Sequence, residues 1–148
     1  MAITTKFPVA IHLLVLVALE GHDHKITSDI IASSTGINPV IIRNCMSDLR
    51  KAQIIDVKRG SGGISISRDS SSISLLDIFK AVDGFGKTKR FFSIHEKPNS
   101  DCFVGKNVTQ VLNCTFSSIE QKVFDELSVI SLNDIIEQFK NRDENLEK

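Results

Sequence analysis

Apolar residues recur at intervals of three and four along several stretches of the chain, which is the spacing that predicts helices with one buried face. Near the N-terminus this spacing is followed by Ile11, Leu14, Val15 and Ala18. Gly21 is expected to end that first helix. A second stretch covers roughly six to seven turns between about residues 104 and 127. The pattern predicts a mainly α protein in which one helix is much longer than the others.

A shorter helical pattern lies between Thr27 and Lys51 and is interrupted at Gly36. Thr27 can cap one helix, and Gly36 permits the left-handed backbone of a tight turn. Asn38 is a good N-cap and Pro39 suits the first helical position, where its missing N–H costs nothing. The buried stripe of this next helix is expected to be Ile42, Cys45, Met46 and Leu49. Its opposite face bears Val40, Arg43, Asn44, Ser47, Arg50 and Lys51.

Two short strands, at residues 54–57 and 64–67, are expected to follow this helix. They are joined by a glycine-rich, basic segment, Lys58-Arg59-Gly60-Ser61-Gly62-Gly63. A helix, a turn, a second helix and a basic hairpin in this order predict a winged helix-turn-helix, a fold that places one helix in the DNA major groove. The predicted fold class is therefore mainly α with a small β-hairpin wing, followed by a long C-terminal dimerisation helix.

Capping-box patterns mark two later helices, one opening at Ser74 and one at Ser131. The first helix is expected to reach about Val82 and the second about Phe139, with a frayed, charged tail at residues 141–148. The serines at positions 70–72 are expected to form a linker. These boundaries divide the chain into a DNA-binding domain at 1–83, an effector or linker loop at 84–103, and a dimerisation and C-terminal helix region at 104–148.

The distribution of charge adds to the interpretation, although the formal net charge of the whole chain is zero. Residues 1–68 hold eight basic and five acidic side chains, and residues 36–68 alone hold six against two. Positive charge gathered on the predicted DNA-reading segment fits nucleic-acid binding, while chance scatter in a small sample is the alternative.

The N-terminal apolar run superficially resembles a signal peptide, but it is too short to span a bilayer and His12 interrupts it. No small-residue cleavage site follows the run. Three cysteines at irregular spacing argue against a secreted disulfide scaffold. We therefore expect a cytoplasmic protein with no membrane partner.

Five segments occur in an order that resembles one known family: KFPVAIHLLVLVAL, GINPVIIRNCMSDLRKA, KRGSGGISISR, SLLDIFKAV and FFSIHEKPNSDCFVGKNV. They are similar to the Rrf-type (BadM-like) bacterial winged helix regulators over nearly the whole chain. Members of that family are dimeric repressors or activators, so the resemblance implies a dimeric transcription factor, which we expect to be a repressor.

Some members of that family hold an iron–sulfur cluster on three closely spaced cysteines in the loop before the long helix. In this chain the loop from Lys89 to Lys106 has only Cys102. A cluster needs about four ligands, mostly thiolates, so we expect no iron–sulfur cofactor. The resemblance is closest to the cluster-free branch, whose effectors are mostly unassigned.

The predicted DNA contacts divide by chemistry. The guanidinium of Arg43 matches the acceptor pair of guanine, and the amide of Asn44 matches the donor and acceptor of adenine; an ordinary solvated polar face is the alternative. Arg50, Lys51 and Lys58 are expected to meet phosphates. The resemblance implies that Arg59 enters a minor groove. The remaining predicted DNA-contacting residues are Asn38, Val40, Ser47, Ser61 and Gly62.

The long helix is expected to pair with its symmetry mate, because a core this small cannot cover its whole apolar stripe. The predicted dimer interface comprises Val108, Val111, Leu112, Phe116, Ile119 and Val123.

Among the cysteines, Cys45 falls on a core stripe, whereas Cys102 lies in a polar loop at the start of the long helix, where a thiolate is stabilised. A redox role for Cys102 is therefore one hypothesis, and structural indifference is the other. The histidines lack partners at metal-ligand spacing, so no metal site is expected.

The sequence contains neither a recognisable nucleophile–base set nor a phosphate-binding glycine loop that opens a helix, so we do not expect an enzyme. The alternative to a DNA-binding regulator is a sensor or adaptor that acts through protein contacts of its C-terminal helix.

Overall fold

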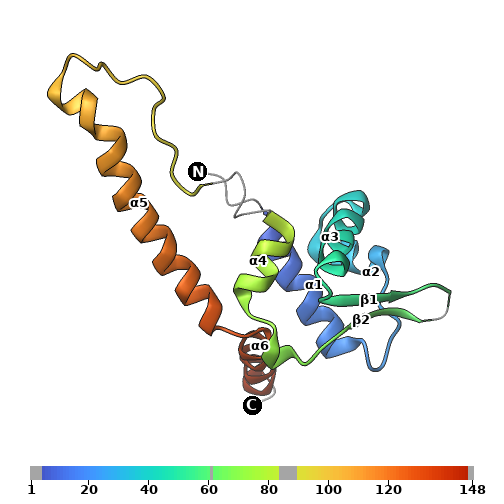
Figure 1. Cartoon of the computed structure of the whole chain (residues 1–148). Helices are drawn as coiled ribbons and strands as arrows, with labels where there is room; N and C mark the ends of the chain where they lie inside the picture. The colour runs from blue at the N-terminus through green and yellow to red at the C-terminus, as the bar shows by residue number, and fades with distance from the viewer. Residues whose placement is uncertain (1–4, 61, 84–89, 147–148) are drawn as a thin grey trace.

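The computed structural model describes residues 5–60, 62–83 and 90–146, and one long helix projects from a cluster of shorter elements (Figure 1). In chain order the elements are α1 (Lys6–Glu20), α2 (Ser28–Thr35), α3 (Pro39–Lys51), β1 (Ile55–Lys58), β2 (Gly63–Ile66), the 3-10 turn η1 (Ser70–Ser72), α4 (Leu75–Asp83), α5 (Phe103–Val129) and α6 (Leu132–Leu146). The mainly α fold with one β-hairpin is confirmed. We use the name head for α1 to α4, the hairpin and α6.

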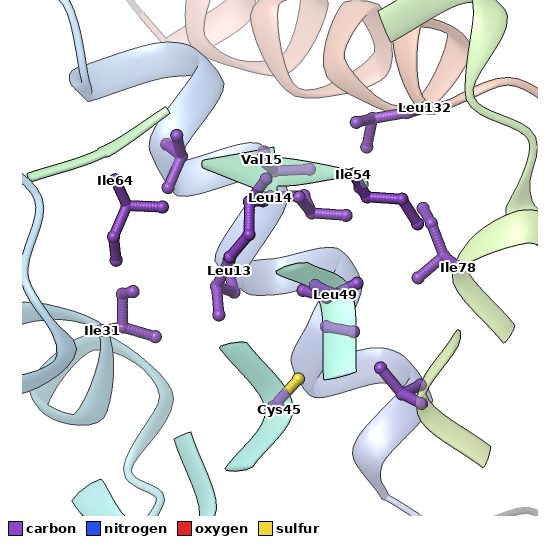
Figure 2. Close-up of a cluster of buried hydrophobic side chains, with 14 of the residues drawn as sticks. Leu13, Leu14, Val15, Ile31, Cys45, Leu49, Ile54, Ile64, Ile78 and Leu132 are labelled. Carbon is purple, nitrogen blue, oxygen red and sulfur yellow. The ribbon is translucent and has the colours of Figure 1, made fainter. Parts of the chain in front are cut away.

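The core of the head is built around α1, which contacts α2, α3, α4, α6 and β2. Ala10, Leu13 and Leu14 are fully buried, and the side chains around them come from every part of the head (Figure 2). This confirms the predicted buried first helix. Burial extends beyond the predicted stripe because neighbours surround α1 on several sides. In the part of the chain that the structure describes, no helix combines the length and apolar character needed to cross a membrane.

The helix-turn-helix forms through the local signals expected from the sequence. The hydroxyl of Thr27 accepts a hydrogen bond from the N–H of Ile30 at 3.4 Å, which caps α2. Gly36 then adopts a left-handed conformation with φ 69°, which a residue with a side chain rarely adopts. The Oδ1 atom of Asn38 accepts from the N–H of Val40 at 2.8 Å and caps α3. The predicted boundaries of both helices are confirmed.

The hairpin, β1 and β2, is an antiparallel pair in which Ile55 lies opposite Ile66 and Lys58 lies opposite Gly63. Its strands begin and end within one residue of the predicted ranges. Ile55 and Ile64 turn into the core, while Asp56 and Ser65 face solvent, as the alternation of a half-buried strand requires.

The starts of α4 and α6 are held side by side. The N–H of Leu75 donates to the carbonyl of Ile130 at 2.9 Å, and the N–H of Leu132 donates to the carbonyl of Ile73 at 2.7 Å. Both helices also begin with the predicted capping boxes, Ser74 with Asp77 and Ser131 with Asp134. This arrangement joins the end of α5 directly to the head.

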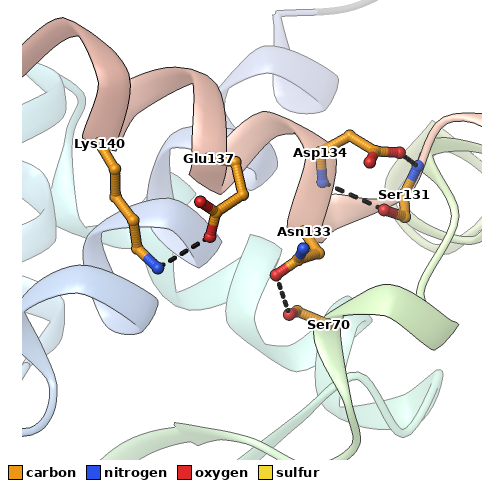
Figure 3. A network of polar contacts seen from close by, with 6 residues as sticks. All are labelled: Ser70, Ser131, Asn133, Asp134, Glu137 and Lys140. Atoms are coloured by element: carbon orange, nitrogen blue, oxygen red, sulfur yellow. Dashed lines mark hydrogen bonds and ion pairs between the residues drawn. The ribbon is translucent and has the colours of Figure 1, made fainter.

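Two predictions about polar segments are wrong. The serine run is not a linker, because it forms η1 and the hydroxyl of Ser70 donates to Oδ1 of Asn133 in α6 at 3.2 Å (Figure 3). The last helix does not end near Phe139, since α6 continues through the charged residues to Leu146. Charged residues are compatible with the exposed face of a helix, so the charged composition after Phe139 does not end α6. Leu132 and Ile136 of α6 are buried in the core of the head.

A cluster of phenylalanines connects α5 to the head. The ring of Phe79 in α4 lies 5.9 Å from that of Phe91 and 6.2 Å from that of Phe124 in α5, measured between centroids. Further along α5, the rings of Phe92 and Phe116 are 4.8 Å apart. The segment 90–102 runs beside α5 to its far end (Figure 1). No residue of α5 is fully buried within this chain.

Candidate nucleic-acid interface

The outer face of α3 presents those residues of this helix that the sequence predicts for DNA contact. The face spans an arc of about 120° at 3.6 residues per turn, and its members, all exposed, are Val40, Arg43, Asn44, Ser47, Arg50 and Lys51. The opposite side of α3 is anchored by Ile42, Cys45 and Leu49, each 0% exposed. Because the buried side is fixed in the core, the outer face has a single orientation relative to the head.

The start of α3 combines a positive helix end with an exposed apolar residue. Asn38 uses its Oδ1 atom to cap the helix, so only its NH2 group is left to donate to DNA. Val40 is 54% exposed in the first turn, where a methyl group can contact the thymine methyl. Ile41, 44% exposed, lies beside it and was not among the predicted contacts.

Arg43 and Asn44 follow one turn later and are both exposed. Their side chains can form the bidentate hydrogen bonds that distinguish guanine and adenine in the major groove. In the described part of the chain, no ion pair involves Arg43 or Arg50. Lys51 lies 3.8 Å from a carboxylate oxygen of Asp48, a long and exposed contact that a phosphate can replace.

The hairpin supplies the second half of the interface. Lys58 and Arg59 are exposed at its tip, and Ser61 lies outside the described residues. A side chain added at Gly62 would place its Cβ 2.2 Å from the Cβ of Lys58. The glycine is therefore needed for the close approach of the two hairpin arms, and its φ lies outside the left-handed region. Gly63 does adopt a positive φ of 66°.

Lys25 braces the hairpin, a role that the sequence analysis did not find. Its Nζ atom donates a hydrogen bond to the carbonyl of Gly60. The Cβ position of Gly63 would lie 3.0 Å from Cγ of Lys25, so the lysine stem also packs against the base of the tip. The two residues are 35 positions apart, and no local spacing signals such a contact.

The predicted dimer residues on α5 fall into two groups. Val111, Ile119 and Val123 are exposed, by 59%, 41% and 38%. The half-buried residues are Val108, Leu112 and Phe116, and Phe116 packs on Phe92 of its own chain. Phe103, 84% exposed, and Val129, 72% exposed, are further apolar residues at the two ends of α5 that the prediction left out.

The three cysteines have different surroundings. Burial, assisted by the nearby Asp48 carboxylate, raises the pKa of the Cys45 thiol to about 11. Cys102 is exposed at the N-cap of α5, where the backbone N–H of Gly105 and then that of Val104 lower the pKa of its thiol. Cys114 is exposed on α5.

The three cysteines are not gathered at one place. Cys102 and Cys114 lie twelve residues apart on one helix, about 18 Å along its axis, and Cys45 is buried in the head. Within the described residues, no three His, Cys, Asp or Glu side chains are placed to share a metal ion.

Comparison with known proteins places these features in a family context. The family model for Rrf2, described as an iron-dependent transcriptional regulator, matches residues 3–138. YwnA of Bacillus subtilis, a candidate HTH-type transcriptional regulator, is 39% identical over 134 residues, which cover 90% of this chain and 96% of YwnA.

Solved structures are similar to this chain over most of its length. A crystal structure of a candidate DNA-binding protein has 34% identity and a TM-score of 0.70, covering 89% of this chain and 99% of its own. The oxidized form of Staphylococcus aureus CymR has a TM-score of 0.67 at 22% identity, over 93% of this chain and 97% of its own. At that identity the likeness to CymR is one of fold.

Proposed function

The chain belongs to the Rrf2 family of DNA-binding transcriptional regulators with a winged helix fold, and from this premise we propose that it binds specific DNA sequences as a homodimer. In this proposal the outer face of α3 enters the major groove and the hairpin tip follows the adjacent minor groove. The single observation that supports it most is the exposed outer face of α3, whose opposite side is buried, beside the basic tip at Lys58 and Arg59.

The roles of individual residues follow from their positions. Arg43 and Asn44 are proposed to contact base edges, with Val40 and Ser47 flanking them. Arg50, Lys51 and Lys58 are proposed to contact phosphates, which set orientation without selecting sequence. Arg59 is proposed to enter a narrow minor groove, whose enhanced negative potential attracts a guanidinium. The NH2 group of Asn38 and the backbone at Gly62 complete the contact surface.

The homodimer is proposed from the surface of α5. The helix has 27 residues, about 40 Å in length, and its apolar side chains Val111, Ile119 and Val123 are exposed within this chain. Pairing with the same surface of a second copy would bury them. Two copies of α3 about 34 Å apart would then meet one face of the duplex.

We further propose that the dimer represses transcription by occupying a promoter, and that oxidation of Cys102 changes its affinity for DNA. Cys102 is exposed and its thiol is acidified by backbone N–H groups, so it is the cysteine most available to an oxidant. The existence of an oxidized form of CymR, a protein of the same fold, is consistent with such a response. Regulation through an iron–sulfur cluster is not proposed, since the cysteines do not fit one.

The proposal is tested by gel shift of the full chain on the DNA upstream of its own gene. The expected result is a shifted complex that excess unrelated DNA does not remove. Sequencing the DNA recovered with the purified protein would define the operator, and increased transcription after deletion of the gene would establish repression. Absence of any sequence preference, together with capture of a partner protein through α6, would favour a sensor or adaptor instead.

A further inference from the structure

A cavity of about 350 Å³ lies at the junction of three elements of the head, the C-terminal end of α1, strand β2 and helix α6. We call it the basic pocket and define it by residues 17, 18, 21, 22, 64–66, 68, 70, 133, 136 and 140. Its volume is within the range of small-molecule sites in proteins. It lies apart from the proposed DNA-contacting residues, none of which lines it.

The charged groups of the pocket are all basic. Arg68 and Lys140 line it together with the imidazole of His22, and no lining residue is acidic. Glu137 accepts a hydrogen bond from Nζ of Lys140 at 2.8 Å, which offsets one of these charges (Figure 3). Asp69 is adjacent in sequence, but its carboxylate accepts from the N–H of Ser71 at 2.8 Å. Within the described residues, no carboxylate forms an ion pair with Arg68.

Polar groups near the cations are already oriented. The hydroxyl of Ser70 donates to Oδ1 of Asn133 at 3.2 Å, and this bond fixes the Asn133 amide (Figure 3). Because the oxygen of that amide is occupied, its NH2 group remains as a donor. A carboxylate in the pocket would accept charge-assisted hydrogen bonds from Arg68 and a further bond from Asn133.

The rest of the lining is apolar. Val17, Ile64 and Ile136 are nearly buried at 5%, 6% and 5% exposure, and Ile66 lies beside them. An inorganic anion would leave this surface unused, whereas an organic acid would cover it with its hydrocarbon part. The combination favours a ligand with one anionic end and one apolar end.

We propose that the basic pocket binds a small organic carboxylate that acts as an effector of DNA binding. The pocket is lined both by β2, one strand of the hairpin, and by α6, which follows α5 directly. A bound ligand would therefore restrain the hairpin relative to the helix pair, and any difference in its affinity between two hairpin orientations would shift their populations. This effector role rests on the proposed function, while the binding itself does not.

The test is calorimetric titration of the full chain, without DNA, using benzoate, its uncharged analogue benzamide, and inorganic phosphate. We expect benzoate to bind and the other two compounds to bind at least ten-fold more weakly. Arg68→Gln should weaken benzoate binding at least ten-fold, because it removes a charged hydrogen-bond donor. The matched control is Lys97→Gln, which neutralises an exposed lysine of the segment 90–102 and should leave binding unchanged.

Equal binding of benzoate and benzamide, or benzoate binding that survives Arg68→Gln, would overturn the carboxylate site. Phosphate binding as strong as benzoate binding would overturn the organic class of ligand. A protein that shifts operator DNA but does not bind benzoate would contradict this proposal alone. Benzoate binding by a protein without affinity for any DNA would support the pocket and contradict the proposed function.

Discussion

Single residues on the proposed interface differ in what they can contribute, because a base edge, a groove and a phosphate each require different chemistry. Arg43 lies on α3 and can form two parallel hydrogen bonds to one base. Arg59 lies at the hairpin tip, which Lys25 braces through the carbonyl of Gly60. Lys58 precedes it on β1 and offers a single point charge. Substituting these residues one at a time should therefore separate sequence selection from general affinity.

Replacing Arg43 by alanine is expected to cost about 1–3 kcal/mol of operator binding and to relax the preference at one base step. The helix should stay intact because Arg43 is exposed. Binding isotherms on the operator and on a set of single-base variants measure both effects. Unchanged affinity and unchanged preference would mean that α3 is not the helix that reads the sequence.

Replacing Lys58 by alanine should weaken binding to all sequences alike and reduce the salt dependence by about one unit of slope. Arg59→Ala should instead reduce any preference for A·T-rich flanks, where the minor groove is narrow. The measurement is affinity as a function of salt concentration on two operators that differ only in their flanks. Identical profiles for the two variants would contradict the separate roles of the two residues.

The cysteines are expected to react in an order set by their pKa values. The thiolate is the reactive form, so Cys102, whose pKa is lowered, should be alkylated at a pH below that of an ordinary thiol. Cys45, with a pKa of about 11 and no exposed surface, should react only near that pH or after unfolding. Iodoacetamide labelling followed by mass spectrometry across the pH range measures the order.

The functional consequence is tested by titrating the parent protein and Cys102→Ser with hypochlorite while operator binding is followed. The parent should lose binding at a lower dose than the variant. Equal loss of operator binding in both proteins would show that Cys102 does not mediate the response and would favour a small-molecule signal.

At the scale of elements, local signals made most of the fold predictable. Thr27, Gly36 and Asn38 each act on residues within four positions, and their hydrogen bonds and dihedral angles are as the sequence indicated. The outer face of α3 was equally predictable, because the apolar stripe defines its opposite side. Bracing contacts were not predictable, since Lys25 meets Gly60 and Ser70 meets Asn133 across 35 and 63 positions.

The stripe on α5 shows a second limit of periodicity. Apolar spacing indicated that one broad face of the helix would be covered, but not by what. In the structure, Phe116 and Phe124 contact the phenylalanines of the same chain, whereas Val111 and Ile119 remain exposed. Both groups have the same spacing, so only the packing of segment 90–102 separates them.

The turn between α2 and α3 is expected to be the element most sensitive to a small substitution. Gly36→Ala places a Cβ on a residue with φ 69°, which should cost about 1 kcal/mol of unfolding free energy. For a chain of this length the melting temperature should fall by about 2–4 °C. Ser33→Ala, on the exposed side of α2, is the matched control and should leave it unchanged. No destabilisation in Gly36→Ala would indicate that the turn adopts another conformation.

At the scale of the whole molecule, α5 projects from the head (Figure 1), and its apolar residues Val111, Ile119 and Val123 are exposed. Its ring contacts with the rest of the chain include Phe124 with Phe79 and Phe91, and Phe116 with Phe92. A lone helix with this surface is unusual in a stable monomer, because contiguous exposed apolar surface favours association. Phe116 is a poor probe of such association, since its substitution would also disturb the contact with Phe92.

Ile119→Asp is the sharper test of the dimer. Ile119 is 41% exposed, so an aspartate there should leave the monomer folded and place an unpaired charge in the interface. We expect the parent protein to sediment as a dimer at micromolar concentration and the variant to sediment as a monomer. Ser117→Asp is the matched control, because Ser117 is exposed on the other side of the same helix turn.

Loss of the dimer should also lower the affinity for operator DNA, since a monomer presents one copy of α3 where a symmetric operator has two half-sites. If the variant remains dimeric, the dimer interface lies elsewhere on the molecule. If the variant is monomeric and still binds the operator with undiminished affinity, pairing of α5 does not set the spacing of the two copies of α3.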